Sequence, residues 1–77
     1  MEVLLTKKEI EIVNLIVDEG LTNPQIAKRL DKSILTVQHQ LCAIYRACGI
    51  SVVKDYRRFE LYKRIKDGNL TITRRRA

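Results

Sequence analysis

A connection of three residues is the feature that most restricts how this chain can fold. Two stretches with helical periodicity, about 22–30 and 34–48, are joined only by Asp31, Lys32 and Ser33. Because so short a link cannot form a wide loop, the axes of the two helices must cross sharply. The sequence therefore predicts a helix-turn-helix unit in the middle of the chain.

Capping signals predict two helix starts in the first part of the chain. Thr6 can cap a helix while Glu9 reaches back to it, and the apolar periodic stretch that follows ends at Gly20. Thr22 and Gln25 form a second pair of this kind, immediately before a short periodic stretch. We therefore expect a long first helix and a short second helix.

Two further helices are expected in the rest of the chain. Ser33 is the predicted cap of a third helix, which runs from about residue 34 to about residue 48 and stops at Gly49. A fourth helix is expected over residues 51–67, followed by Gly68. A short extended stretch and a basic end follow it.

Length and composition favour one small helical domain. A chain of 77 residues can bury one modest core and leaves little room for a deep substrate pocket. Aliphatic residues are plentiful, whereas the chain has three Gly, one Pro and no Trp, which favours packed helices. We predict an all-α, four-helix domain over residues 1–70 and a basic C-terminal tail over residues 71–77.

Neither a membrane segment nor a bound cofactor is expected. No apolar run approaches the ~20 residues of a membrane span, and the N-terminal stretch lacks a signal-peptide core, so we expect a cytoplasmic protein. Cys42 and Cys48 would lie roughly 9 Å apart along one helix, too far for a disulfide, so both thiols should be free. One His and two Cys offer no zinc ligand set, and we predict no metal and no cofactor.

The predicted third helix has two different sides. At ~100° per residue, one side, the apolar arc, should face the core and consists of Ile34, Val37, Leu41, Ile44, Tyr45 and Cys48. The other side, the polar arc, consists of Leu35, Gln38, His39, Cys42, Ala43 and Arg46. A purely solvated face usually carries Lys and Glu, whereas small hydrogen-bonding and apolar groups suit base edges in a DNA major groove.

Positive charge is concentrated outside the polar arc. Residues 51–77 carry nine of the fifteen Lys and Arg residues of the chain. Charged side chains that could attract phosphates flank the third helix, namely Lys28, Arg29, Lys32 and Lys54. A basic surface that only aids solubility explains the charge equally well. It is the combination with a groove-like polar arc on a helix-turn-helix that favours double-stranded DNA as the partner.

The stretch from Leu5 to Ile50 resembles the LuxR/GerE-type helix-turn-helix DNA-binding domain. The residues that carry the resemblance are Leu5, Thr6, Lys8, Glu9, Glu11, Gly20, Asn23, Ile26, Ala27, Leu30, Ser33, Thr36, Val37, Leu41, Ile44, Gly49 and Ile50. The resemblance implies a four-helix fold, sequence-specific DNA binding by the third helix and dimerisation through the fourth. Family members usually attach this domain to a receiver or a sensor, so this chain resembles the stand-alone kind.

Carried over residue by residue, the resemblance assigns base reading to Gln38, His39 and Cys42. With the charge argument, it implies phosphate-binding or supporting roles for Asn23, Lys32, Ser33, Leu35, Thr36, Gln40, Arg46 and Lys54. The chain departs from the family pattern at Gln38 and Gln40, where Lys and His are usual. These differences change the surface that would select a target sequence.

The fourth helix carries two apolar strips. One strip, formed by Val52, Tyr56, Phe59 and Tyr62, suffices to cover the core of the domain. The other strip, Leu61 and Ile65, is the predicted interface of a weak two-fold homodimer. In the alternative interpretation, both strips belong to the core.

The predicted function is a DNA-binding transcription regulator. An enzyme is not expected, because the only candidate pair, His39 and Cys42, lacks a third orienting group and a pocket. An alternative from another class stays open: a protein-interaction module that titrates a related regulator into inactive heterodimers. The low charge of the third helix is what favours this alternative.

Overall fold

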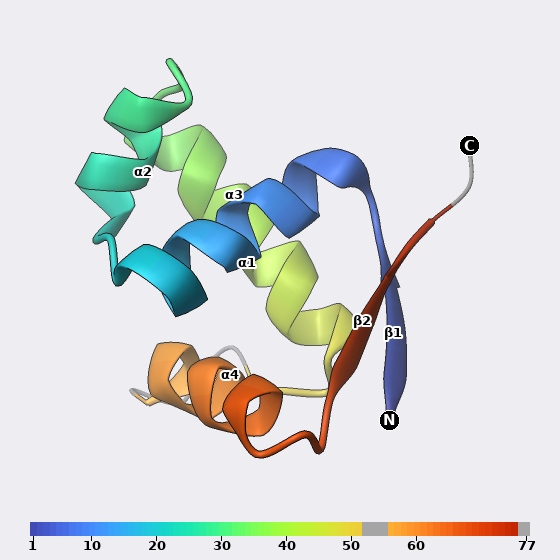
Figure 1. Cartoon of the computed structure of the whole chain (residues 1–77). Helices are drawn as coiled ribbons and strands as arrows, with labels where there is room; N and C mark the ends of the chain where they lie inside the picture. Colours follow the sequence, from blue (N-terminus) through green and yellow to red (C-terminus); the bar gives the residue numbers. More distant parts are fainter. Residues whose placement is uncertain (52–55, 76–77) are drawn as a thin grey trace.

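Four helices and two short strands make up the part of the chain that the computed structural model describes, residues 1–51 and 56–75 (Figure 1). In chain order they are β1 (Glu2–Leu5), α1 (Lys7–Glu19), α2 (Asn23–Arg29), α3 (Ile34–Ala47), α4 (Arg57–Lys66) and β2 (Thr71–Arg74). The chain is thus mostly helical, and α3 packs against α1, α2 and β1. Among the described residues, no helix is long and apolar enough to cross a membrane.

Both predicted capping boxes are confirmed. The Glu9 amide donates to Thr6 Oγ1 over 3.2 Å, and the Thr6 amide donates to Glu9 Oε1 over 2.9 Å. The same reciprocal pair joins Thr22 and Gln25 at 3.4 Å and 2.8 Å. Each box satisfies amide groups that the first turn of a helix leaves without a partner, which is why these local signals located the starts of α1 and α2.

The sharp turn between α2 and α3 is built on a residue with left-handed backbone geometry. Asp31 has a φ of 55°, which non-glycine residues seldom adopt. Two hydrogen bonds close the end of α2 around it: the Asp31 amide donates to the Lys28 carbonyl over 3.3 Å, and the Lys32 amide donates to the Ala27 carbonyl over 2.8 Å. This pattern ends α2 and directs the chain into α3.

Replacing Asp31 with Val is expected to lower the free energy of unfolding by about 1–2 kcal/mol, because a β-branched residue fits poorly at positive φ. Asp31→Gly is the matched control, since glycine adopts this geometry without a steric penalty. Urea denaturation of both variants measures the difference. Equal stability of the Val and Gly variants would contradict the role of the left-handed turn.

The two ends of the chain form a small parallel sheet, so the prediction of an all-α fold is wrong in this part. Figure 1 shows β1 and β2 side by side at one edge of the helices. The Thr71 amide donates to the Met1 carbonyl over 2.8 Å, and the Arg75 amide donates to the Leu5 carbonyl over 2.7 Å. Val3 and Leu5 alternate with exposed residues and enter the core. Strands of four residues leave too short a sequence pattern to be recognised without their partner.

Residues 71–74, assigned from sequence to the basic tail, are strand β2. Leu70, just before the strand, is buried, and Ile72 is half-buried against the core. Arg74 and Arg75 are exposed. The chain therefore remains attached to the fold at least as far as Arg75, through the hydrogen bond to Leu5.

The core gathers apolar side chains from β1 and from the four helices, together with residues just outside them. Its buried members are Val3, Leu5, Ile12, Val13, Ile16, Ile26, Ala27, Val37, Leu41, Ile44, Tyr45, Cys48, Ile50, Leu61 and Leu70. Helix α4 begins at Arg57, later than the predicted start at residue 51, and Ser51 is not helical. Residues 52–55, among them Val52 and Lys54, lie outside the described part of the chain.

Candidate nucleic-acid interface

The two sides of α3 differ as the helical periodicity predicted. Five members of the apolar arc are buried, whereas every member of the polar arc except the half-buried Cys42 is exposed. Ile34 is the exception in the apolar arc, with 45% of its surface exposed, so its predicted place in the core is wrong. It is the first residue of α3, and residues 34–36 are all exposed at this end of the helix.

The three predicted base readers lie around one hollow. Gln38, His39 and Cys42 line a cavity of about 330 Å³, which we call the α3 hollow. The other lining residues are Asn23, Leu35, Leu41, Tyr45 and Arg57. Residues from α2, α3 and α4 thus meet at the polar arc, and among residues 1–51 and 56–75 no carboxylate lines the hollow.

Among the predicted supporting residues, Ser33 and Thr36 fix the start of α3. The Thr36 amide donates to Ser33 Oγ over 3.1 Å, and the two hydroxyl oxygens lie 2.8 Å apart. Such an N-cap typically stabilises a helix by ~1 kcal/mol. The observed role of these two side chains is therefore to hold the first turn of α3, at the end of the polar arc.

A second predicted pair joins the turn to the body of α3. Lys32 Nζ donates to Gln40 Oε1 over 3.2 Å, and both residues are half-buried. The bond leaves two of the three N–H groups of the Lys32 ammonium for other acceptors. Arg46, in the last turn of α3, is exposed, and Lys54 lies outside the described residues.

Two arginines of α4 approach this surface, and sequence reasoning did not assign them to it. Arg58 Nη1 donates to Asn23 Oδ1 over 2.7 Å, which ties α4 to the first residue of α2. The Arg57 guanidinium lies over the Tyr45 ring, 5.6 Å from its centroid. Neither contact has a signal in the sequence, because Arg58 and Asn23 are 35 residues apart.

The predicted dimer interface is wrong at Leu61, while the prediction for Ile65 stays a prediction. Leu61 is fully buried in the core of the single chain, and Ile65 is half-buried against that core. The opposite strip is the exposed one: Tyr56, Phe59 and Tyr62 have exposed fractions of 75%, 61% and 40%. We call these three residues the aromatic strip. Periodicity identified both strips, but it could not decide which of them faces the core.

Burial shapes the acid–base chemistry of two groups behind the polar arc. Burial raises the pKa of Tyr45 above its ordinary value of 10.0, partly opposed by Arg58 and Arg57. It also raises the pKa of Cys48 above 9.0, partly opposed by Arg64. Both cysteines are free, as predicted. Among residues 1–51 and 56–75, no cluster of His, Cys, Asp and Glu could hold a metal ion.

These two shifts predict a loss of stability in alkaline solution. Because the pKa of Cys48 is raised in the folded state, folding favours the neutral thiol. The contribution of this thiol to the free energy of unfolding is therefore complete below pH 9 and declines as the pH rises through the folded-state pKa of Cys48. Urea denaturation between pH 7 and pH 10.5 should show this decline. Cys48→Ala should weaken the pH dependence and leave the Tyr45 contribution, whereas Cys42→Ala serves as the control. The same pH dependence in all three proteins would contradict the assignment.

Comparisons with known proteins add no assignment. A scan against protein-family models, a search of curated proteins and a search of solved structures each found no match to this chain. The residues and geometry of the chain itself, with the resemblance of residues 5–50 noted above, are the basis for inferring its function.

Proposed function

We propose that this protein is a sequence-specific, double-stranded DNA-binding transcription regulator that inserts α3 into the major groove. One observation carries the proposal: the polar arc of α3 is exposed as a coherent surface on a helix-turn-helix. A helix of this kind fits the width of the B-DNA major groove, with α2 crossing the backbone. The resemblance to LuxR/GerE-type domains supports the same role.

The chemistry of the polar arc suits base edges. The Gln38 side-chain amide can make two hydrogen bonds to adenine, and His39 offers a ring nitrogen to a base edge or a phosphate. Cys42 and Leu35 can contact a thymine methyl group. In this proposal Arg46, one turn further along α3, holds a phosphate.

Selection of bound sequences from a random duplex pool tests the proposal. A regulator should enrich one motif, consistent with two half-sites if it binds as a dimer. The alternative function, a module that titrates a related regulator, predicts weak binding without a motif. The exposed aromatic strip is the observation that favours this alternative, because such a surface can serve a protein partner.

We further propose that the aromatic strip pairs with a second copy of the chain to form a weak homodimer, with a related regulator as the alternative partner. Three of the four aromatic residues of the chain lie on it, namely Tyr56, Phe59 and Tyr62. A short strip of this size buries less area than a stable interface normally needs, which explains why the dimer would be weak.

Phe59→Ser should therefore weaken the dimer by about 1.5 kcal/mol or more, because it removes apolar area from both sides of a two-fold contact. The isolated subunit should keep its stability, since Phe59 is 61% exposed. Sedimentation equilibrium measures the dimer, and Lys63→Ser on the same helix is the control. If neither variant alters the dimer population, the aromatic strip is not the interface.

A further inference from the structure

The core of the molecule is partly open between α1 and α4. A groove of about 380 Å³ lies there, and Ile and Val side chains form most of its wall. We call it the α1–α4 groove, and its apolar residues are Ile10, Val13 and Val17 of α1, Ile65 of α4 and Ile72 of β2. Val13 is buried, whereas the other four are half-buried against the core, so part of their apolar surface stays accessible.

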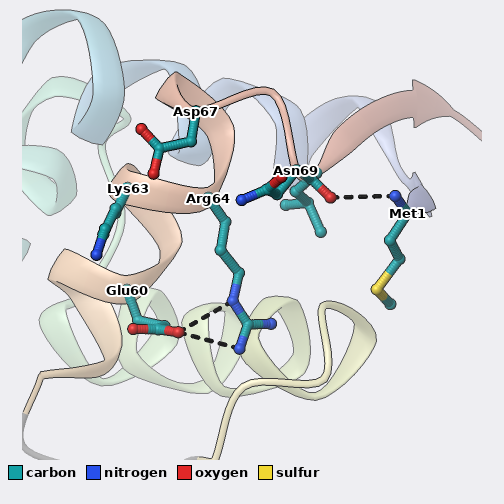
Figure 2. A pocket seen from close by; sticks show the side chains of 7 residues that line it. Met1, Glu60, Lys63, Arg64, Asp67 and Asn69 are labelled. Atoms are coloured by element: carbon teal, nitrogen blue, oxygen red, sulfur yellow. Dashed lines mark hydrogen bonds and ion pairs between the residues drawn. The ribbon is translucent and has the colours of Figure 1, made fainter.

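A hollow on another side of α4 has a different character. Figure 2 shows that polar and charged side chains form most of its lining, namely Glu60, Lys63, Arg64, Asp67 and Asn69. Arg64 is paired with Glu60 there at 3.0 Å, and the N-terminal ammonium donates to the Asn69 carbonyl over 3.0 Å. Covering such groups with an apolar partner costs free energy. Of these two hollows, the α1–α4 groove is therefore the one that suits an apolar occupant.

The aromatic strip of α4 adjoins this groove. Lys66 lines the groove, and its ammonium nitrogen lies 5.9 Å from the centre of the Tyr62 ring. Tyr62 is also about one helical turn from Ile65, which forms part of the groove wall. The strip and the groove therefore form one continuous surface, in which exposed aromatic rings lie beside an apolar recess.

A surface with both a projection and a recess can pair with a copy of itself. In a two-fold dimer each copy contributes the same patch, so a strip that enters the groove of the other copy is matched by the reverse contact. Three aromatic side chains that meet only another strip supply less than the about 800 Å² that a stable interface normally buries on each partner. Docking in the groove adds the apolar wall of the recess to the buried area.

Charges at the edge of this surface favour the same pairing. Asp18 of α1 and Lys66 of α4 both line the groove, and both are exposed. Within the described chain these two residues do not form an ion pair with each other. About a two-fold axis beside the groove, Lys66 of each copy meets Asp18 of the other, which gives two attractive contacts. The groove thus offers a carboxylate to the cation that accompanies Tyr62.

From this arrangement we propose that Tyr62 of each copy enters the α1–α4 groove of the other copy, where Lys66 lies beside Asp18. The inference rests on the proposed homodimer and adds to it the surface that receives the aromatic strip. An aromatic side chain in an apolar recess is a common anchor of protein interfaces. The charge pairs at the edge fix the orientation of the two copies more than they strengthen the dimer.

An exchange of charges between copies tests the pairing. Asp18→Lys and Lys66→Asp should each weaken the homodimer by about tenfold, because either change turns both contacts between copies into repulsions. An equimolar mixture of the two variants should form a heterodimer with close to the parent affinity, since both contacts are then attractive again. Sedimentation equilibrium at low salt measures these dimers. The matched control is Lys63→Asp, which changes an exposed cation of α4 at the hollow of Figure 2 and should alter the dimer far less.

Both substituted residues are exposed, so the single chains should keep their fold. Circular dichroism checks this, and Lys66→Glu replaces Lys66→Asp if the latter does not fold. A mixture that dimerises as weakly as either variant alone overturns the inference, because the charges then act within one chain and mixing cannot restore them.

NMR of a mixture of isotope-labelled and unlabelled parent protein supplies a second arm. It should show contacts between the Tyr62 ring of one copy and methyl groups of Ile10 or Ile72 of the other copy. Contacts between the two aromatic strips would instead overturn the inference and leave the homodimer in place.

The proposed homodimer fails by a different result. A parent protein that sediments as a monomer at every concentration contradicts the homodimer and the inference together. A dimer that Phe59→Ser weakens, but that neither charge variant alters, supports the aromatic strip as the interface and overturns only its docking in the α1–α4 groove. The DNA-binding role is judged separately, from the selection of duplexes.

Discussion

Replacing Leu61 with alanine is expected to lower the free energy of unfolding by about 2–5 kcal/mol, the usual cost of emptying a fully buried leucine site. Leu61 has no exposed surface and lies in the central cluster of the core. The expected loss is a large share of the ~5–15 kcal/mol that stabilises a small domain, so the variant should be partly unfolded near physiological temperature. This side chain stabilises the single chain, not a contact between chains.

Urea denaturation at two protein concentrations separates the two roles. A core residue lowers stability equally at both concentrations, whereas an interface residue has an effect that depends on concentration. Phe59→Ala is the matched control on the same helix, and its exposed position predicts a change within about 0.5 kcal/mol in the single chain. A Leu61→Ala protein that keeps the parent stability would show that the core position of Leu61 is incorrect.

Gln38→Ala and His39→Ala should each reduce the discrimination between the selected duplex and random duplexes by roughly 1–3 kcal/mol, a factor of about 5 to 150. Each good base contact contributes about this amount of binding free energy. The substitution removes this contribution only from the duplex that carries the correct base. Fold stability should barely change, because both side chains are exposed on α3. Affinity for random DNA should also change little.

Arg46→Ala is the matched comparison on the same face of α3. Because Arg46 is proposed to contact a phosphate, Arg46→Ala should lower the affinity for selected and random duplexes by a similar factor. It should also reduce the salt slope. Fluorescence anisotropy with both duplexes at several salt concentrations measures all three variants. If Gln38→Ala and His39→Ala keep the parent ratio of affinities, α3 does not read bases, and the titrating interaction module becomes the better proposal.

The part of the site that lies on a single helix could be predicted from the sequence. Periodicity along α3 identified the exposed positions of Gln38, His39 and Cys42, because neighbours on a helix face are fixed by the helix geometry. The contribution of α4 was not predictable. Arg57 lines the α3 hollow and Arg58 bonds to Asn23 only because the fold brings the start of α4 close to α2 and α3, and sequence spacing carries no record of that placement.

The sequence by itself determined the starts of α1, α2 and α3 and the short turn before α3. These features depend on hydrogen bonds between residues three to five positions apart, such as Thr6 with Glu9 and Lys32 with Ala27. Local signals of this kind need no partner from a distant part of the chain. Helical periodicity also indicated which side of α3 is apolar, except at Ile34.

Only the tertiary structure decided which strip of α4 is buried and that the chain ends pair as a sheet. Two apolar strips on one helix satisfy the same periodicity, and the space left by the other elements admits Leu61 while the aromatic strip stays outside. Likewise β1 acquires its partner only when Val3 meets Ile72, from the opposite end of the chain. A short strand has no hydrogen bonds of its own, so its existence depends on a neighbour that the fold must first bring into place.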